Sequence, residues 1–270
     1  MADEVLRKER QGRVGTLILN RPDKGNSLSV ELLLKLIQAL QEWAGDDTIR
    51  TLVITGTGDK AFCGGFDVRS IPTELPPQEE ASAGAKGLKS PNPVEQLLDQ
   101  VKNYPYPTIA MLNGYALGAG FNLAMCCDLR IAADHVRMGI PPAKLGLVYH
   151  PEGIKQVVEA VGMARAREVF FTGRLYAPED VREMGLVHQM VPGSELAGVT
   201  YRLAEEISEN APLSLKGIKQ ILNLFGKSLG LSERDRQAAE LIVAGSFLSE
   251  DLKEGQLAFI QKRKPDFKGR

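Results

Sequence analysis

The 270-residue sequence has few of the features that mark disulfide-rich or metal-binding proteins. Its cysteines are odd in number, and two are adjacent in an apolar stretch, so reduced thiols fit better than a disulfide framework. No CxxC or HExxH spacing occurs, and the histidines are far apart, which argues against a dedicated metal site. The residues concerned are Cys63, Cys126, Cys127, His135, His150 and His188.

Charge imbalance and long apolar runs are also absent. The 33 Lys and Arg residues nearly balance the 34 Asp and Glu residues, so the chain has no overall electrostatic footprint for nucleic acid or an anionic membrane. No apolar run approaches membrane-spanning length, and the start MADEVLRKER is charged where a signal peptide is apolar. We therefore expect a cytoplasmic protein with neither a nucleic acid nor a membrane as its partner.

The common nucleotide and nucleophile motifs are incomplete. Gly118 and Gly120 start a dinucleotide-like pattern, but its third glycine position holds Leu123. The run Phe225–Ser228 ends like a phosphate loop, yet Ile221 stands at the required first glycine. A G-x-S-x-G nucleophile elbow is missing. These absences exclude several common enzyme classes.

The first half of the chain alternates strand and helix patterns. Nearly continuous apolar runs indicate strands that are buried on both faces, and Ser29 can cap a helix with apolar residues at helical spacing. This alternation predicts an α/β core with crossover connections. The expected strands are Val14–Asn20, Thr51–Thr55, Thr108–Leu112 and Leu129–Ala132.

The chain divides by character into residues 1–192, the α/β core, and residues 193–270, which are mainly helical. A stretch rich in Pro, Glu, Ala, Gly, Ser and Lys, at about residues 71–93, predicts a mobile surface loop inside the core. The helices of the second part are amphipathic, so we expect them to pack on the core or on another subunit. Their expected ranges are Glu195–Glu209, Pro212–Leu229, Ser232–Ala244 and Asp251–Arg263.

Two glycine-containing loops follow strands, Ala61–Asp67 and Asn113–Asn122. Glycine lets another molecule approach the backbone closely, and free N–H groups at a helix start suit a developing anion. Two such loops that converge on one oxygen would form an oxyanion hole. The alternative is that these glycines serve only tight turns and close packing.

The two loops, together with Leu19–Ser29 (LNRPDKGNSLS) and Ala258–Phe267 (AFIQKRKPDF), resemble the crotonase, or enoyl-CoA hydratase/isomerase, superfamily. The resemblance covers nearly the whole chain. It implies a spiral core of repeated ββα units with a helical C-terminal region, assembled as a homotrimer or homohexamer. It also implies an acyl-CoA substrate and no cofactor other than the coenzyme A of that substrate.

The resemblance further implies a set of site residues. The N–H groups of Phe66 and Ala119 would hold the thioester oxygen, and two other stretches would line the coenzyme A channel. Phe259 and Lys262 match positions that touch its nucleotide end, although Lys262 would equally suit a solvated basic tail. The implied channel residues are Asn26, Ser27, Leu28, Cys63, Gly64, Gly65, Asp67 and Gly118.

The two glutamates that hydratases of this family use are replaced. One carboxylate of that pair activates water, and the other handles the α-proton. At the matching positions this sequence has Asn122, which does not titrate, and Pro142, which has no polar side-chain group. Hydration by the usual acid–base pair is therefore not expected.

Three other candidates precede a predicted helix, Ile154–Val161. Tyr149 can donate to a carboxylate, His150 can titrate near neutrality, and Glu152 can act as a base. The alternative is an ordinary helix entry, in which Glu152 favours the positive helix end and Tyr149 packs in the core.

Within the superfamily, Pro142–Tyr149 is most similar to the methylmalonyl-CoA decarboxylase branch, which has a tyrosine at this place. That branch carries a histidine where this chain has Phe66. We expect decarboxylation of a malonyl-type CoA ester, since loss of CO2 forms the enolate without a base. The alternatives are a hydratase, isomerase or hydrolase that uses His150 or Glu152 as its base, and a non-catalytic CoA-binding or RNA-associated member of the fold.

Overall fold

The computed structural model describes residues 4–66, 93–226, 230 and 232–268. The predicted mobile loop, apart from Pro93, lies outside these residues, as does the predicted channel residue Asp67.

A six-stranded sheet forms the centre, in the order β1-β2-β3-β5-β7-β10. β1 and β2 form an antiparallel hairpin, and every other pairing in this sheet is parallel. The four predicted strands are confirmed as β2, β3, β5 and β7, within one residue at their ends. The six strands are β1 (Leu6–Gln11), β2 (Val14–Leu19), β3 (Thr51–Gly56), β5 (Thr108–Leu112), β7 (Leu129–Ala133) and β10 (Gln189–Val191).

The central strands of this sheet are buried on both faces. Leu52 and Ile54 of β3 belong to the larger hydrophobic cluster, while Val53 between them belongs to a second cluster. Because side chains alternate along a strand, the two clusters lie on opposite faces. The apolar runs in the sequence reflect this double burial.

A second sheet of short strands, in the order β4-β6-β8-β9, lies beside the first. The chain alternates between the two sheets and then forms a helix, as in β5-β6-α4 and β7-β8-α5. The predicted crotonase-like core of repeated ββα units is thereby confirmed. The short strands are β4 (Ala61–Cys63), β6 (Tyr115–Leu117), β8 (Met138–Gly139) and β9 (Leu175–Tyr176).

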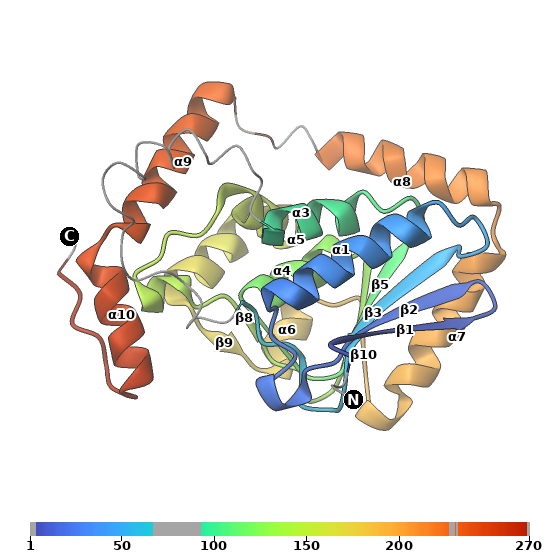
Figure 1. Ribbon diagram of the computed structural model, residues 1–270, viewed down its shortest axis with the longest axis horizontal. Helices are drawn as coiled ribbons and strands as arrows, with labels where there is room; N and C mark the ends of the chain where they lie inside the picture. The colour runs from blue at the N-terminus through green and yellow to red at the C-terminus, as the bar shows by residue number, and fades with distance from the viewer. Residues whose placement is uncertain (1–3, 67–92, 227–229, 231, 269–270) are drawn as a thin grey trace.

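Helices cover both faces of the six-stranded sheet, with α1 and α3 on one side and α7 on the other (Figure 1). The predicted cap of α1 is present, because the Ser29 side chain accepts a hydrogen bond from the Leu32 N–H at 3.2 Å. α5 has a non-helical residue inside it, Gly162 with φ 75°. The helices of the core are α1 (Val30–Ala44), α3 (Pro93–Lys102), α4 (Ala119–Cys126), α5 (Pro151–Thr172) and α6 (Pro178–Glu183), with 3-10 turns η1 (Pro22–Lys24), η3 (Pro142–Leu145) and η4 (Gly193–Glu195).

The C-terminal region is helical, as predicted. α7 packs on the sheet, α8 lies at the upper right of the view, and α9 and α10 lie at the left end of the molecule (Figure 1). α10 packs closely on η3: a Cβ at Gly255 would lie 2.5 Å from the Leu145 carbonyl oxygen. The four helices are α7 (Leu196–Glu209), α8 (Pro212–Gly226), α9 (Glu233–Phe247) and α10 (Glu250–Ile260).

Candidate active site

The two predicted glycine loops meet at Gly65. β4 leads into the first loop, and β6 leads through Gly118 into α4. Gly65 has φ 89°, and a Cβ there would lie 2.6 Å from the Leu117 carbonyl oxygen and 3.5 Å from the Ala119 nitrogen. Only glycine allows this approach without a shift of the backbone. The convergence of the loops, which an oxyanion hole requires, is therefore present.

The backbone N–H groups of Phe66 and Ala119 are not used by the surrounding secondary structure. Ala119 is the first residue of α4, so its N–H has no acceptor within the helix. Phe66 forms a bridge with Leu28, in which the Leu28 N–H donates to the Gly65 carbonyl at 2.8 Å. Among the described residues, neither N–H donates to another residue. Two such groups beside each other suit a developing oxyanion.

Asn26 braces the first loop. It is fully buried with φ 53°, and its Nδ2 donates to the Ala61 carbonyl at 2.7 Å, while its Oδ1 accepts from the Arg21 N–H at 3.0 Å. Its side chain is thus engaged in holding the turn. The neighbouring Ser27 is buried and accepts hydrogen bonds from the Arg21 guanidinium, and Leu28 is fully buried in the core.

In its described part, residues 61–66, the first loop contributes backbone groups and no reactive side chain. Cys63 is fully buried, and burial raises the pKa of its thiol to about 12, so it remains protonated. The Gly64 N–H donates to the Gly25 carbonyl at 2.8 Å. Cys63 therefore does not act as a nucleophile.

Asn122 and Tyr149 form a hydrogen-bonded pair next to Ala119. Asn122 lies one helical turn after Ala119 on α4, and the Tyr149 hydroxyl donates to its Oδ1. The Asn122 Nδ2 donates to the Gln156 Oε1 at 2.6 Å and to the Gly153 carbonyl at 3.0 Å. From the sequence we expected the Tyr149 hydroxyl to donate its proton to a carboxylate. In the structure it donates that proton to the Asn122 Oδ1 instead. Pro142, in η3, is buried and offers no proton.

His150 contacts a carboxylate, a pairing that the sequence did not indicate. Its Nε2 lies 3.0 Å from the Glu95 Oε1, at the start of α3. Both side chains are about one-third exposed. The His150 Nδ1 is buried and has no partner among the described residues. One ring nitrogen is therefore held by a carboxylate, and the other makes no hydrogen bond within the described part of the chain.

Burial and several nearby charged groups shift the pKa of the Glu95 carboxyl. Burial raises the pKa of its carboxyl, the nearby His150 lowers it, and the carboxylates of Glu152 and Glu240 raise it further. Glu152 lies exposed in the first turn of α5. Its described effect on Glu95 is that its negative charge raises the pKa of the Glu95 carboxyl.

The C-terminal candidates are at the surface. Phe259 is 60% exposed at the end of α10, and Lys262 is exposed with φ 54°. The chain after α10 is held by Arg263, which contacts both oxygens of Glu254 at 2.6 and 2.8 Å. This ion pair fixes where Lys262 is presented.

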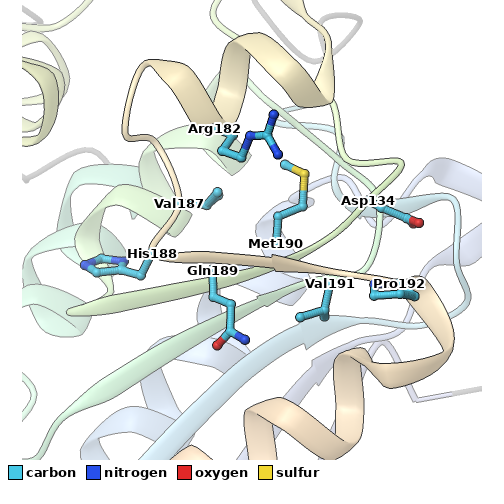
Figure 2. Close-up of a pocket in the computed structure, with 8 residues that line it drawn as sticks. All are labelled: Asp134, Arg182, Val187, His188, Gln189, Met190, Val191 and Pro192. Carbon is cyan, nitrogen blue, oxygen red and sulfur yellow. The ribbon is translucent and has the colours of Figure 1, made fainter.

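A separate hollow of about 400 Å³ lies along β10, away from these residues. Figure 2 shows Arg182 and Met190 on one side of the strand, with Gln189 and Val191 pointing to the other. Burial and the nearby Arg130 lower the pKa of His188, which borders this hollow. In the described part of the chain, we find no cluster of side chains suited to a metal ion. A helix able to span a membrane is likewise absent from that part.

The comparisons with known proteins agree with this geometry. Residues 9–270 match the family described as enoyl-CoA hydratase/isomerase. The chain is 36% identical to a putative enoyl-CoA hydratase of Thermus thermophilus, over 95% of this chain and 98% of the relative. It is 34% identical to 2,3-dehydroadipyl-CoA hydratase of Escherichia coli, over 97% of each chain.

A solved structure of methylmalonyl-CoA decarboxylase, in complex with 2-nitronate-propionyl-CoA, is also similar. It superposes with a TM-score of 0.88 and 28% identity over the full length of both chains. The names of the sequence relatives fit the hydratase/isomerase alternative better than the decarboxylation that we expected first. The chain belongs to the enoyl-CoA hydratase/isomerase family, the crotonase superfamily of enzymes that process acyl-CoA thioesters.

Proposed function

We propose that this enzyme catalyses a reaction of the enoyl-CoA hydratase/isomerase class, with His150 as the group that moves the proton. The observation that carries the proposal is the His150–Glu95 pair at 3.0 Å, with the His150 Nδ1 unpartnered among the described residues. A carboxylate that accepts from Nε2–H fixes the tautomer and leaves Nδ1 as the base. This arrangement supplies the proton transfer that Asn122 and Pro142 do not.

In the hydration direction, the His150 Nδ1 takes a proton from water while the water oxygen bonds to C3 of the enoyl chain. The electron pair of the double bond moves toward the thioester, whose oxygen becomes an enolate oxygen between the N–H groups of Phe66 and Ala119. His150 then returns the proton to C2, which gives the 3-hydroxyacyl thioester. Every atom comes from water and the thioester, so the proposed reaction needs no cofactor beyond the coenzyme A of the substrate.

The test is the pH–rate profile of crotonyl-CoA hydration in His150→Gln and Glu152→Gln variants. We expect His150→Gln to lower kcat by about 100- to 10,000-fold, the usual contribution of a general base. The exposed Glu152→Gln variant is the matched control and should keep most activity. Hydration that is unaffected in His150→Gln would remove His150 from this role.

Decarboxylation of a malonyl-type CoA ester is the second candidate. It is favoured by Asn122 and Pro142, which cannot exchange protons, and by the likeness to methylmalonyl-CoA decarboxylase. Cleavage of the C–CO2 bond leaves its electron pair on the thioester enolate, and water supplies the proton. Incubation with methylmalonyl-CoA and crotonyl-CoA, scored for CO2 release and hydration, separates the two candidates. Binding without turnover of either thioester would favour the non-catalytic alternative.

We also propose that the enzyme assembles as a homotrimer or homohexamer. The buried Lys219 of α8 pairs with Asp128 at 2.7 Å, which fixes the orientation of the helix. The same helix then presents Leu213 (83% exposed) and Leu222 (63% exposed) to the outside. Such apolar faces typically pack against another subunit. Sedimentation velocity tests this, and a monomer at micromolar concentration would contradict it.

For the compartment we propose the cytoplasm. The support is that all three cysteines are free and buried, as is usual for proteins in a reducing environment. Cell fractionation tests the proposal, and recovery of the protein outside the cytoplasmic fraction would contradict it.

A further inference from the structure

The orientation of the Asn122 amide is determined by its buried surroundings. Asn122 is fully buried, and its side chain has three polar partners. One of them, the Gly153 carbonyl, can only accept a hydrogen bond. The amide nitrogen must therefore face Gly153, whichever way the Gln156 amide is turned. The amide oxygen is left to face Tyr149.

This orientation determines what the Tyr149 hydroxyl can do. A neutral phenol has a single proton to donate, and the Asn122 oxygen takes it. Turning that proton toward a ligand would leave the buried Asn122 oxygen without a partner, which is unfavourable. Burial also raises the pKa of Tyr149 above its ordinary range, so the phenol keeps its proton. Toward a ligand, Tyr149 therefore offers an oxygen lone pair.

The tyrosine ring is held in place as well. It packs on Phe170 with ring centroids 5.4 Å apart, and a Cβ at Gly153 would lie 2.5 Å from its Cε1. The hydroxyl is hydrogen-bonded to the side chain of Asn122, which lies one turn of α4 after Ala119. The Tyr149 hydroxyl is therefore held beside the start of α4, the helix whose first residue carries the Ala119 N–H.

We propose that Tyr149 accepts a hydrogen bond from a hydroxyl on the acyl chain, so that the site selects 3-hydroxyacyl-CoA thioesters over acyl chains that carry a carboxylate. The inference rests on the proposed function, in which the hydroxyl is formed at C3. A carboxylate has no proton to donate and would face the lone pairs of Tyr149. Asn122 is the positioning residue that sets this preference.

Thioether analogues test the preference without turnover, because they lack the thioester carbonyl. Isothermal titration would compare 3-hydroxybutyl-CoA, butyl-CoA and 2-carboxypropyl-CoA. We expect the wild-type protein to bind the hydroxyl analogue about 3- to 10-fold more tightly than butyl-CoA, the usual size of one hydrogen bond. The carboxylate analogue should bind more weakly than butyl-CoA.

Three variants locate the cause. Tyr149→Phe keeps the ring. In this variant 3-hydroxybutyl-CoA and 2-carboxypropyl-CoA should each bind with the same affinity as butyl-CoA. Asn122→Leu frees the phenol proton and should raise the affinity for 2-carboxypropyl-CoA relative to butyl-CoA. Gln156→Met is the matched control, since the Gly153 carbonyl still orients Asn122, and it should keep the wild-type order of affinities.

Two results would overturn the inference. One is tightest binding of 2-carboxypropyl-CoA by the wild-type protein, lost in Tyr149→Phe, because it would make Tyr149 a donor. The other is equal affinity of the wild-type protein for 3-hydroxybutyl-CoA and butyl-CoA. Failure of the proposed hydration would instead appear as absent turnover of crotonyl-CoA, which leaves these binding measurements unchanged.

Discussion

A Cβ placed on Gly120 would lie 2.7 Å from the Cβ of Cys63 and would collide with the Cys63 carbonyl oxygen. Gly120 is the second residue of α4, so this contact presses the start of the helix against the first glycine loop. The distance between the Phe66 and Ala119 N–H groups therefore depends on the absence of a side chain at residue 120.

We predict that Gly120→Ala separates the two loops and lowers kcat/KM for acyl-CoA turnover by about 100-fold, the usual cost of displacing reacting groups by about 1 Å. Overpacking should also lower the free energy of unfolding by about 1–3 kcal/mol. Steady-state kinetics and urea unfolding measure the two effects.

Gly198→Ala is the matched control for this change. Gly198 is exposed in α7, and a Cβ there would meet only the flexible end of Arg202 at 3.6 Å. We expect unchanged kinetics for the control. Wild-type activity and stability in Gly120→Ala would show that the loops are not held by this contact.

The Ala119 N–H can be removed without loss of a helical hydrogen bond. Proline is tolerated at the first position of a helix, where the N–H has no acceptor within the helix. Ala119→Pro should therefore fold, yet lower kcat by about 100- to 1000-fold, as loss of one oxyanion donor typically does. In this variant the proline ring also occupies the space that the N–H hydrogen of residue 119 occupies in the wild-type protein.

Ala119→Ser keeps the N–H and is the control, for which we expect nearly wild-type kcat. Circular dichroism and thermal unfolding establish that both variants are folded. Full activity in Ala119→Pro would exclude this N–H from the oxyanion hole.

The core strands and the oxyanion loops could be predicted because their signals are local. Buried parallel strands such as β3 are continuous apolar runs. The two loops that meet at Gly65 are marked in the sequence by glycines that follow two strands. β1 was not predicted, because its sequence LRKERQ is charged and mostly exposed. It is an edge strand that takes its conformation from pairing with β2.

The proton-handling part of the site could not be predicted in the same way. The His150–Glu95 pair depends on how the start of α3 meets the start of α5, and no local pattern records that packing. Tyr149 was recognised from its resemblance to a relative, but the direction of its hydrogen bond depends on Asn122 and on the Gly153 carbonyl. Residue identity alone would have made it a donor to the substrate.

The contact between α10 and η3 gives a third prediction. A Cβ at Gly255 would lie 2.5 Å from the Leu145 carbonyl oxygen, so Gly255→Ala must push α10 away from η3. If Phe259 and Lys262 bind the nucleotide end of coenzyme A, KM should rise about 10-fold while kcat changes little, because uniform binding is lost. Kinetics with a short acyl-CoA measure both constants.

The control is Gly245→Ala in α9, where a Cβ would have nothing within 4 Å. There the substitution should raise the free energy of unfolding by up to about 1 kcal/mol through helix propensity, with unchanged KM. An unchanged KM in Gly255→Ala would argue against a coenzyme A contact from this part of the chain.

The last prediction concerns acid. Glu254 has its pKa lowered to about 2, first by its hydrogen bonds with Arg263 and then by the Asp266 N–H, which lies 2.8 Å from its Oε1. A carboxyl whose pKa is lowered by folding stabilises the folded state above its unfolded pKa of 4.5, and this contribution is lost as the pH falls from there toward 2. Because Glu254 lies at the surface, salt will weaken the effect.

We therefore expect Glu254→Gln to be less stable than the wild-type protein at pH 7, with a difference that shrinks as the pH falls below about 4.5. Urea unfolding at pH 7, 5 and 3.5 measures it. Arg263→Gln removes the partner and should give the same trend, because the ion pair needs both charges. A difference that is equally large at pH 3.5 and pH 7 would mean that Glu254 acts through packing. The charge of its carboxylate would then not be what holds the chain after α10.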